Sequence, residues 1–171
     1  AWSLFCLGNS SDAFLLLRAH DLGLSTTLTV LAYSAYNLVF CLLSWPLGSL
    51  SDRVGRERVL VGGLVVFGLV YLAFAAAPPA WALWPLFAVY GAYTAATEGV
   101  ARAWVADRAG SLGTGAVYGA FATVTGAALL VASVGAGLLW SHAGHWTPFA
   151  AGAASAAAGA LAILLARAVS R

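Results

Sequence analysis

The sequence predicts an all-α integral membrane protein with six transmembrane helices. Of its 171 residues, 62% are hydrophobic and 8% are charged, and the mean hydropathy is +0.90. Soluble domains carry about 25% charged residues, so this chain has too few charges to cover a surface that faces water. The apolar residues form six long stretches with short polar breaks between them, and lipid is the solvent that suits such a chain.

Each of the six stretches is long enough for one membrane crossing, which takes about 20 apolar residues. They are approximately 1–19, 26–47, 59–77, 81–101, 115–140 and 147–169. The polar stretch 48–58 separates the second from the third, and Pro78 and Pro79 end the third. Because the connections are short, we expect antiparallel neighbours in one bundle that covers 1–171. The chain starts at Ala1 inside an apolar run, so we expect a truncated N-terminus.

The distribution of arginine predicts the orientation in the membrane. Cytoplasmic loops of membrane proteins carry an excess of basic residues. If the second loop lies in the cytoplasm, only Arg18 lies toward the outside, and both termini are cytoplasmic. Seven arginines then lie on the cytoplasmic side: Arg53, Arg56, Arg58, Arg102, Arg108, Arg167 and Arg171.

Composition argues against nucleic-acid and metal chemistry. The net charge is +2, and no run of basic residues resembles a nucleic-acid surface. Cys6 and Cys41 lie in apolar runs, where we expect small core residues rather than a disulfide framework. His142 and His145 have no third ligand nearby, so we expect a solvated turn. The sequence therefore predicts no metal, no cofactor and no nucleic-acid partner.

The second loop carries a charged motif, GSLSDRVGRERVL at 48–60. Gly48 and Gly55 allow close backbone approach and positive φ. Asp52 can accept hydrogen bonds from free N–H groups at a helix start, and the arginines can pair with carboxylates in a fork. Such a cluster predicts a latch that joins helix ends and opens when they separate. The alternative is a simple positive-inside anchor.

The fourth stretch ends in a further charged pair. Glu98 and Arg102 lie one helical turn apart on one face, close to the membrane core, where an unpaired charge is costly. We therefore expect them to join the loop motif in a single latch. Its members would be Gly48, Asp52, Arg53, Gly55, Arg56, Glu98 and Arg102. The alternative is a surface pair that contributes about a few tenths of a kcal/mol.

Polar residues inside three of the stretches predict a pathway through the membrane. Asp12 lies half-way along the first stretch, where a carboxylate costs about 2.5–3.5 kcal/mol and is functional by default. At about 100° per residue, the polar residues fall in narrow stripes that could face one wet cavity. The candidates are Asn9, Ser11, Asp12, Arg18, Tyr33, Asn37, Tyr90, Thr94 and Thr97. For the hydroxyl groups, the alternative is hydrogen bonding between helices, worth about 0.6–2 kcal/mol each.

The loop motif resembles the signature of the major facilitator superfamily, G-x-L-x-D-R-x-G-R-[RK]-x-x-L. Every fixed position matches except Glu57, which stands where a basic residue is usual. Residues 9–14 (NSSDAF) and 17–19 (LRA) are also similar to the seventh helix of a prokaryotic subgroup. The resemblance implies the C-terminal six-helix half of a twelve-helix transporter, located in the inner membrane of a prokaryote. Its partners would be the lipid bilayer, a small-molecule substrate and a second six-helix half, from the same natural chain or from a homodimer mate.

The function that the resemblance implies is secondary active transport of a small organic solute by alternating access. Asp12 would bind a proton or a cationic group. A channel or passive membrane scaffold is one alternative, although nothing resembles a selectivity filter. An intramembrane protease is the other, but the histidines lie at loops or helix ends and no G-x-S-x-G motif occurs. We therefore expect no enzyme.

Overall fold

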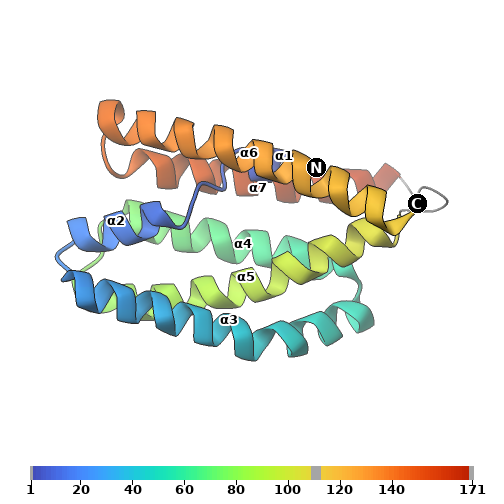
Figure 1. Ribbon diagram of the computed structural model, residues 1–171, viewed down its shortest axis with the longest axis horizontal. Coiled ribbons are helices and arrows are strands. Elements are labelled where there is room, and N and C mark those ends of the chain that lie inside the picture. The colour runs from blue at the N-terminus through green and yellow to red at the C-terminus, as the bar shows by residue number, and fades with distance from the viewer. Residues whose placement is uncertain (1, 109–112, 170–171) are drawn as a thin grey trace.

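The computed structural model describes residues 2–108 and 113–169 and folds them into one bundle of helices (Figure 1). The helices are α1 (Trp2–Cys6), α2 (Ala13–Asp21), α3 (Thr26–Val54), α4 (Arg56–Ala75), the short 3₁₀ helix η1 (Ala80–Ala82), α5 (Leu83–Ala106), α6 (Thr114–Ala143) and α7 (Thr147–Val169). Within the described ranges there is no strand, so the all-helical class is confirmed. Ala1, the start of the first predicted span, and Arg171, one of the seven arginines of the predicted cytoplasmic side, lie outside the described residues.

Four helices are long and apolar enough to cross a membrane, namely α3, α4, α6 and α7. The fourth predicted span, α5, has the length at 24 residues but is not among these four helices. Its sequence is interrupted by tyrosines, threonines, Glu98 and Arg102. The first candidate is divided between α1 and α2, which have 5 and 9 residues. Each of these two exceptions contains buried polar residues, namely Ser10 and Arg18 in the first and Thr94 and Thr97 in α5.

The expected first span differs most from the structure, because residues 7–12 interrupt it. Glycine, asparagine, serine and aspartate are weak helix formers, and residues 8–12 (GNSSD) are all of these types. The freed backbone finds other partners. The Ser11 N–H donates to Ser133 Oγ of α6 at 3.1 Å, and the Ala13 N–H donates to Ser11 Oγ at 3.3 Å. Irregular backbone at membrane depth is tolerated only where protein buries it or a cavity adjoins it.

The break expected at 48–58 also differs, because α3 runs through Pro46 and most of the loop motif to Val54. Gly48 and Asp52 are therefore helical. Only Gly55 separates α3 from α4, and its φ of +99° lies in the region that glycine adopts without strain. The motif is thus a one-residue junction between two helices rather than an extended loop.

The bundle has two distinct ends (Figure 1). The α3–α4 junction, the end of α5, the start of α6 and the end of α7 lie together at one end, which we call the arginine-rich end because it holds most of the arginines. The α2–α3, α4–α5 and α6–α7 connections lie at the opposite end. Helix α1 lies midway along the bundle against α6 and α7.

The core is aromatic and centres on α4, α5 and α7. Phe5, Phe67, Tyr71, Phe74 and Phe149 are all fully buried. Helix α5 packs mainly on α3 and α4, and α7 packs on α4 and α1. Leucines and valines on the outer faces of α3 and α6 stay exposed, as suits surfaces that meet lipid or another helical unit.

Candidate functional site

A cavity of about 920 Å³ lies beside the break between α1 and α2. Side chains of α1, the break, α3, α5 and α6 line it. The structure brings seven of the nine predicted pathway residues to its wall: Asn9, Ser11, Asp12, Tyr33, Tyr90, Thr94 and Thr97. The polar stripes of three segments therefore face one space, and a fourth helix, α6, closes it with Tyr118, Phe121 and Thr125.

Asp12 is the centre of the polar contacts in this cavity. The Tyr90 hydroxyl donates to its Oδ1 at 2.7 Å, and the Tyr33 hydroxyl donates to its Oδ2 at 3.3 Å. Asp12 is the residue before α2, yet its side chain forms no capping bond to that helix. Both carboxylate oxygens are thus directed to tyrosines of α3 and α5. The break makes this possible because it turns the carboxylate out of a regular helix and toward the cavity.

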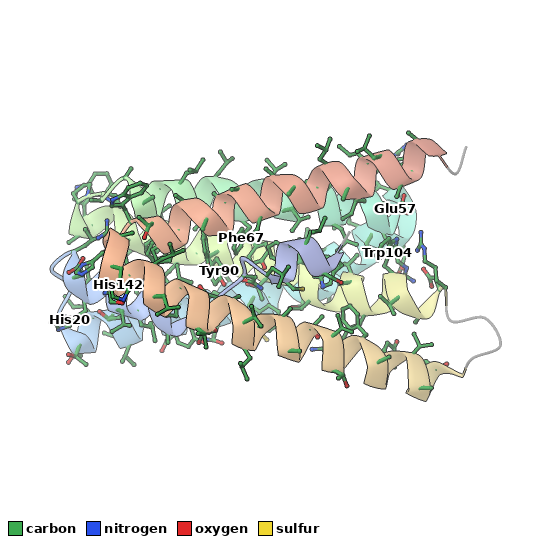
Figure 2. All side chains as sticks on the ribbon, turned by 90° about the horizontal axis from the view of Figure 1, so that it is seen from above. His20, Glu57, Phe67, Tyr90, Trp104 and His142 are labelled. Atoms are coloured by element: carbon green, nitrogen blue, oxygen red, sulfur yellow. The ribbon has the colours of Figure 1, made fainter. Side chains whose placement is uncertain are left out.

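Tyrosine rings form one wall of the cavity. The rings of Tyr33 and Tyr36 stack at 5.0 Å, Tyr36 and Tyr90 are 5.3 Å apart, and Tyr90 and Tyr93 are 5.2 Å apart. In Figure 2, Tyr90 and Phe67 lie together in the middle of the bundle. Tyr36 and Tyr93 are cavity residues that were not among the predicted ones. The signal was a repeated Tyr-x2-Tyr, which places both rings on one helix face.

Three of the other predicted polar residues donate hydrogen bonds within their own helices, whereas the buried Oδ1 of Asn9 has no partner among the described residues. Thr94 and Thr97 donate to backbone carbonyls of α5 at 3.0 and 2.9 Å while their side chains line the cavity. Asn37 donates to the carbonyl of Tyr33 at 2.8 Å, is exposed, and lies outside the cavity lining. The hydrogen bonds from Tyr33 and Tyr90 to Asp12, in contrast, join different elements of the cavity wall.

Arg18 lies outside the cavity, contrary to the predicted stripe. It is 6% exposed, and its guanidinium caps the end of α4. Nε donates to the carbonyl of Phe74 at 3.1 Å, and Nη2 donates to that of Ala75 at 3.4 Å. Because the last carbonyls of a helix carry the negative end of its dipole, this position suits a cation. Nη1 also pairs with Asp21 at 2.9 Å.

Asp21 links this capping group to the α6–α7 turn. His145 Nδ1 lies 2.9 Å from Asp21 Oδ2, and the His145 ring stacks on Trp140 at 4.4 Å. The hydrogen bonds from His145 and from Arg18 hold the pKa of Asp21 below its usual 3.8. The turn at His145 is therefore tied to α2, in place of the purely solvated turn that we expected.

At the arginine-rich end, ion pairs join three helix ends. Arg56 pairs with Asp52 at 3.2 Å and also with Asp107. Glu57 accepts hydrogen bonds from Trp104 Nε1 at 3.2 Å and from Arg108 at 2.7 Å. We call these residues the terminal charge cluster: Asp52, Arg56, Glu57, Trp104, Asp107 and Arg108. Figure 2 shows Glu57 and Trp104 together at this end of the bundle.

The terminal charge cluster differs in membership from the predicted latch. Asp52 and Arg56 belong to it, and they flank Gly55. Arg53, Glu98 and Arg102 are exposed and form no ion pair with any described residue. Instead, Glu98 and Arg102 line a second, smaller hollow of about 410 Å³ between α3 and α5, together with Gly48, Asp52 and Arg56.

Replacing Arg56 by glutamine is expected to destabilise the terminal charge cluster. The change removes both pairs of Arg56, and partly exposed pairs contribute about 0.2–1 kcal/mol each. We therefore expect a loss of about 1 kcal/mol in the free energy of unfolding, measured in mild detergent. Arg53→Gln is the matched control, because it makes the same charge change three residues away without removing a pair. Equal losses in the two variants would contradict the cluster.

Comparisons with known proteins agree with the membrane character of the chain. A profile of the Major Facilitator Superfamily matches residues 2–171. The chain is 36% identical over 144 residues to an uncharacterised transporter of this type from Methanocaldococcus jannaschii. It is 32% identical over 123 residues to a puromycin resistance protein from Streptomyces alboniger and 34% identical over 118 residues to the class C tetracycline resistance protein from Escherichia coli.

These matches cover 81%, 71% and 69% of the chain. They cover 36%, 24% and 29% of the three relatives, so the chain spans about a quarter to a third of their length. No solved structure matches the chain.

Proposed function

The chain belongs to the major facilitator superfamily, and we propose that it forms one half of a secondary active transporter that works by alternating access. Membrane transport by a multi-pass, non-enzymatic protein is what the family and the relatives have in common. In the proposed transport cycle, the substrate binds in the 920 Å³ cavity, the arginine-rich end acts as the gate, and Asp12 couples transport to a proton or a cationic group.

The observation that carries the proposal is Asp12, held by two tyrosine hydroxyls beside a helix break in a large cavity. Discontinuous membrane helices occur at transporter binding sites, and an intramembrane carboxylate is a functional residue by default. The volume suits a small organic solute, since sites for drug-sized ligands measure about 300–1,000 Å³. Relatives named for resistance to puromycin and tetracycline support a solute of this kind. Asp12 would bind a proton or a cationic group of the solute.

The second half of the transporter would be another six-helix unit, from the same natural chain or from a homodimer mate. The exposed faces of α3 and α6 favour such a partner, because polar residues of the cavity wall need protein or water opposite them. The arginine-rich end would face the cytoplasm of a prokaryotic cell, with both termini there. The terminal charge cluster would act as a latch that holds this end closed in part of the cycle.

Transport and alternating access are tested together in the natural full-length protein. With all native cysteines, Cys6 and Cys41 among them, replaced by alanine, a single cysteine is placed at Thr125 on the cavity wall. We expect its labelling to switch sides when a pH gradient and substrate are applied, with uphill solute accumulation in proteoliposomes. A control cysteine at Gly144, in the α6–α7 turn, should label from the outside in every state.

A channel or passive scaffold predicts a different result. In a channel, a cysteine at Thr125 would label from both sides at once, and solute would move only down its gradient. In a scaffold, no flux would be measured. Either result would contradict the proposed function.

A further inference from the structure

We infer that Glu98 is a second cation-binding carboxylate of the cavity, and that the transported solute is an organic cation whose charged group moves between Asp12 and Glu98. This inference rests on the proposed function and adds to it the charge of the substrate and a second binding residue. In this inference Glu98 is a binding residue and not a member of the latch that was predicted from the sequence.

Glu98 has a position that no other acidic residue of the chain shares. The chain contains six acidic residues, all in the described ranges. Five accept a hydrogen bond or an ion pair from a described side chain: Asp12, Asp21, Asp52, Glu57 and Asp107. Glu98 accepts none and is exposed. It also lines both the 920 Å³ cavity and the 410 Å³ hollow, and the only other residue in both linings is Arg102.

The two carboxylates lie at different depths on one wall. Tyr90, which donates to Asp12, precedes Glu98 by eight residues of α5, or about 12 Å along the helix axis. Thr94 and Thr97 line the wall between them. In Figure 2, Tyr90 is in the middle of the bundle and Trp104 is near the arginine-rich end. Glu98 lies between these two residues in the sequence of α5. The wall therefore presents one carboxylate at mid-depth and one toward the arginine-rich end.

The surroundings of these carboxylates suit a cation with an apolar body. Asp12 is half-buried and Glu98 is exposed, and a carboxylate attracts a positive group more strongly the less water surrounds it. Aromatic side chains, including Phe5, Tyr36, Tyr93 and Phe121, form much of the same wall. Aromatic rings bind organic cations through their negative faces and bury apolar surface as well. An anionic solute would meet two like charges in this cavity and one opposite charge, from Arg102.

Arg102 allows a test, because the direction in which its removal changes cation binding differs between a latch and a binding site. It lies one turn from Glu98 on the same helix face, and neither side chain forms an ion pair with a described residue. If both belonged to a latch, removing either charge would have the same effect, because each change breaks one pair. If Glu98 binds the cationic substrate, the two changes act in opposite directions. Arg102 then repels the bound cation and competes with it for Glu98.

The experiment measures binding to the purified full-length protein by isothermal titration. The probes are tetraphenylphosphonium and tetraphenylborate, which share size and shape but have opposite charges. We expect the cation to bind and the anion to bind at least about tenfold more weakly. Glu98→Gln should weaken cation binding about tenfold, and Arg102→Gln should strengthen it about threefold. Arg58→Gln is the matched charge control, because Arg58 is exposed and lies outside both linings.

Equal or same-direction shifts in the Glu98 and Arg102 variants would overturn the inference, as would preferred binding of the anion. Glu98→Asp keeps the charge and should retain binding, which separates loss of charge from loss of fold. Alternating labelling at Thr125 with no cation preference would leave the proposed function standing and overturn only the inference. If the labelling at Thr125 did not alternate but the Glu98 and Arg102 variants still shifted cation affinity in opposite directions, the inference would stand and the proposed function would be overturned.

Discussion

Asp12→Asn is expected to reduce transport by the full-length protein at least about a hundredfold while membrane insertion and folding stay intact. Asparagine has nearly the same shape as aspartate, and its carbonyl can still accept a hydrogen bond from Tyr90 or Tyr33. The side chain loses its negative charge, however, and with it the capacity to bind either a proton or a cationic group. The measurement is the initial rate of solute movement in proteoliposomes under a pH gradient.

Asp21→Asn is the matched control for this change. Asp21 is the other carboxylate of the same segment, but it lies at the α2–α3 connection and contacts His145 and Arg18 rather than the cavity. We expect it to retain transport. Wild-type rates in Asp12→Asn would show that Asp12 is structural, and equal losses in both variants would point to a general defect of the segment.

Gly91→Ala is expected to cost about 3 kcal/mol in the free energy of unfolding, the largest effect on stability in this set. A Cβ atom at Gly91 would lie 2.5 Å from the carbonyl oxygen of Tyr36 and 3.2 Å from the backbone nitrogen of Phe40. These are backbone atoms of α3, so they can withdraw only if the two helices separate. Separation would also pull Tyr36 from Tyr90 and disturb the hydrogen bonds to Asp12.

Gly99→Ala, on the same helix, is the control with the opposite sign. Nothing lies within 4 Å of a Cβ atom at Gly99. Alanine is the better helix former by about 0.8–1 kcal/mol, so this change should stabilise the protein. Denaturation of both variants in the same detergent gives the comparison. A stabilised Gly91→Ala would mean that α3 and α5 lie further apart than the structure has them.

Helical periodicity placed Asp12 correctly at the cavity but placed Arg18 there wrongly. The reason is the break between α1 and α2. Placing both residues on one wheel assumes an unbroken helix from 1 to 19. In the structure the chain leaves the helix at residue 7 and re-enters at Ala13, so the angular relation between α1 and α2 is lost. Asp12 reached the cavity because it belongs to the break itself. Arg18 followed α2 and met the carbonyl end of α4.

The terminal charge cluster could be predicted only in part, because ion-pair partners depend on where helices end. Helix α5 continues to Ala106, five residues beyond the expected boundary, and this extension brings Asp107 and Arg108 to the start of α4. Glu57, the one departure from the family signature, is the residue that Arg108 binds. A one-turn spacing suggested a pair between Glu98 and Arg102, but spacing does not say whether two side chains turn toward each other or toward a cavity.

Close contacts between residues 5–8 and α7 bear on the order in which parts of the protein fold during synthesis. Gly8 is so close to Ser155 that a Cβ atom would collide with its hydroxyl, and a Cβ atom at Gly159 would lie 2.8 Å from the Phe5 side chain. These contacts join residues that are 147 and 154 positions apart in the sequence. Since α7 begins only at Thr147, we expect the segment that carries Asp12 to reach its final position late in synthesis, once α7 has left the ribosome.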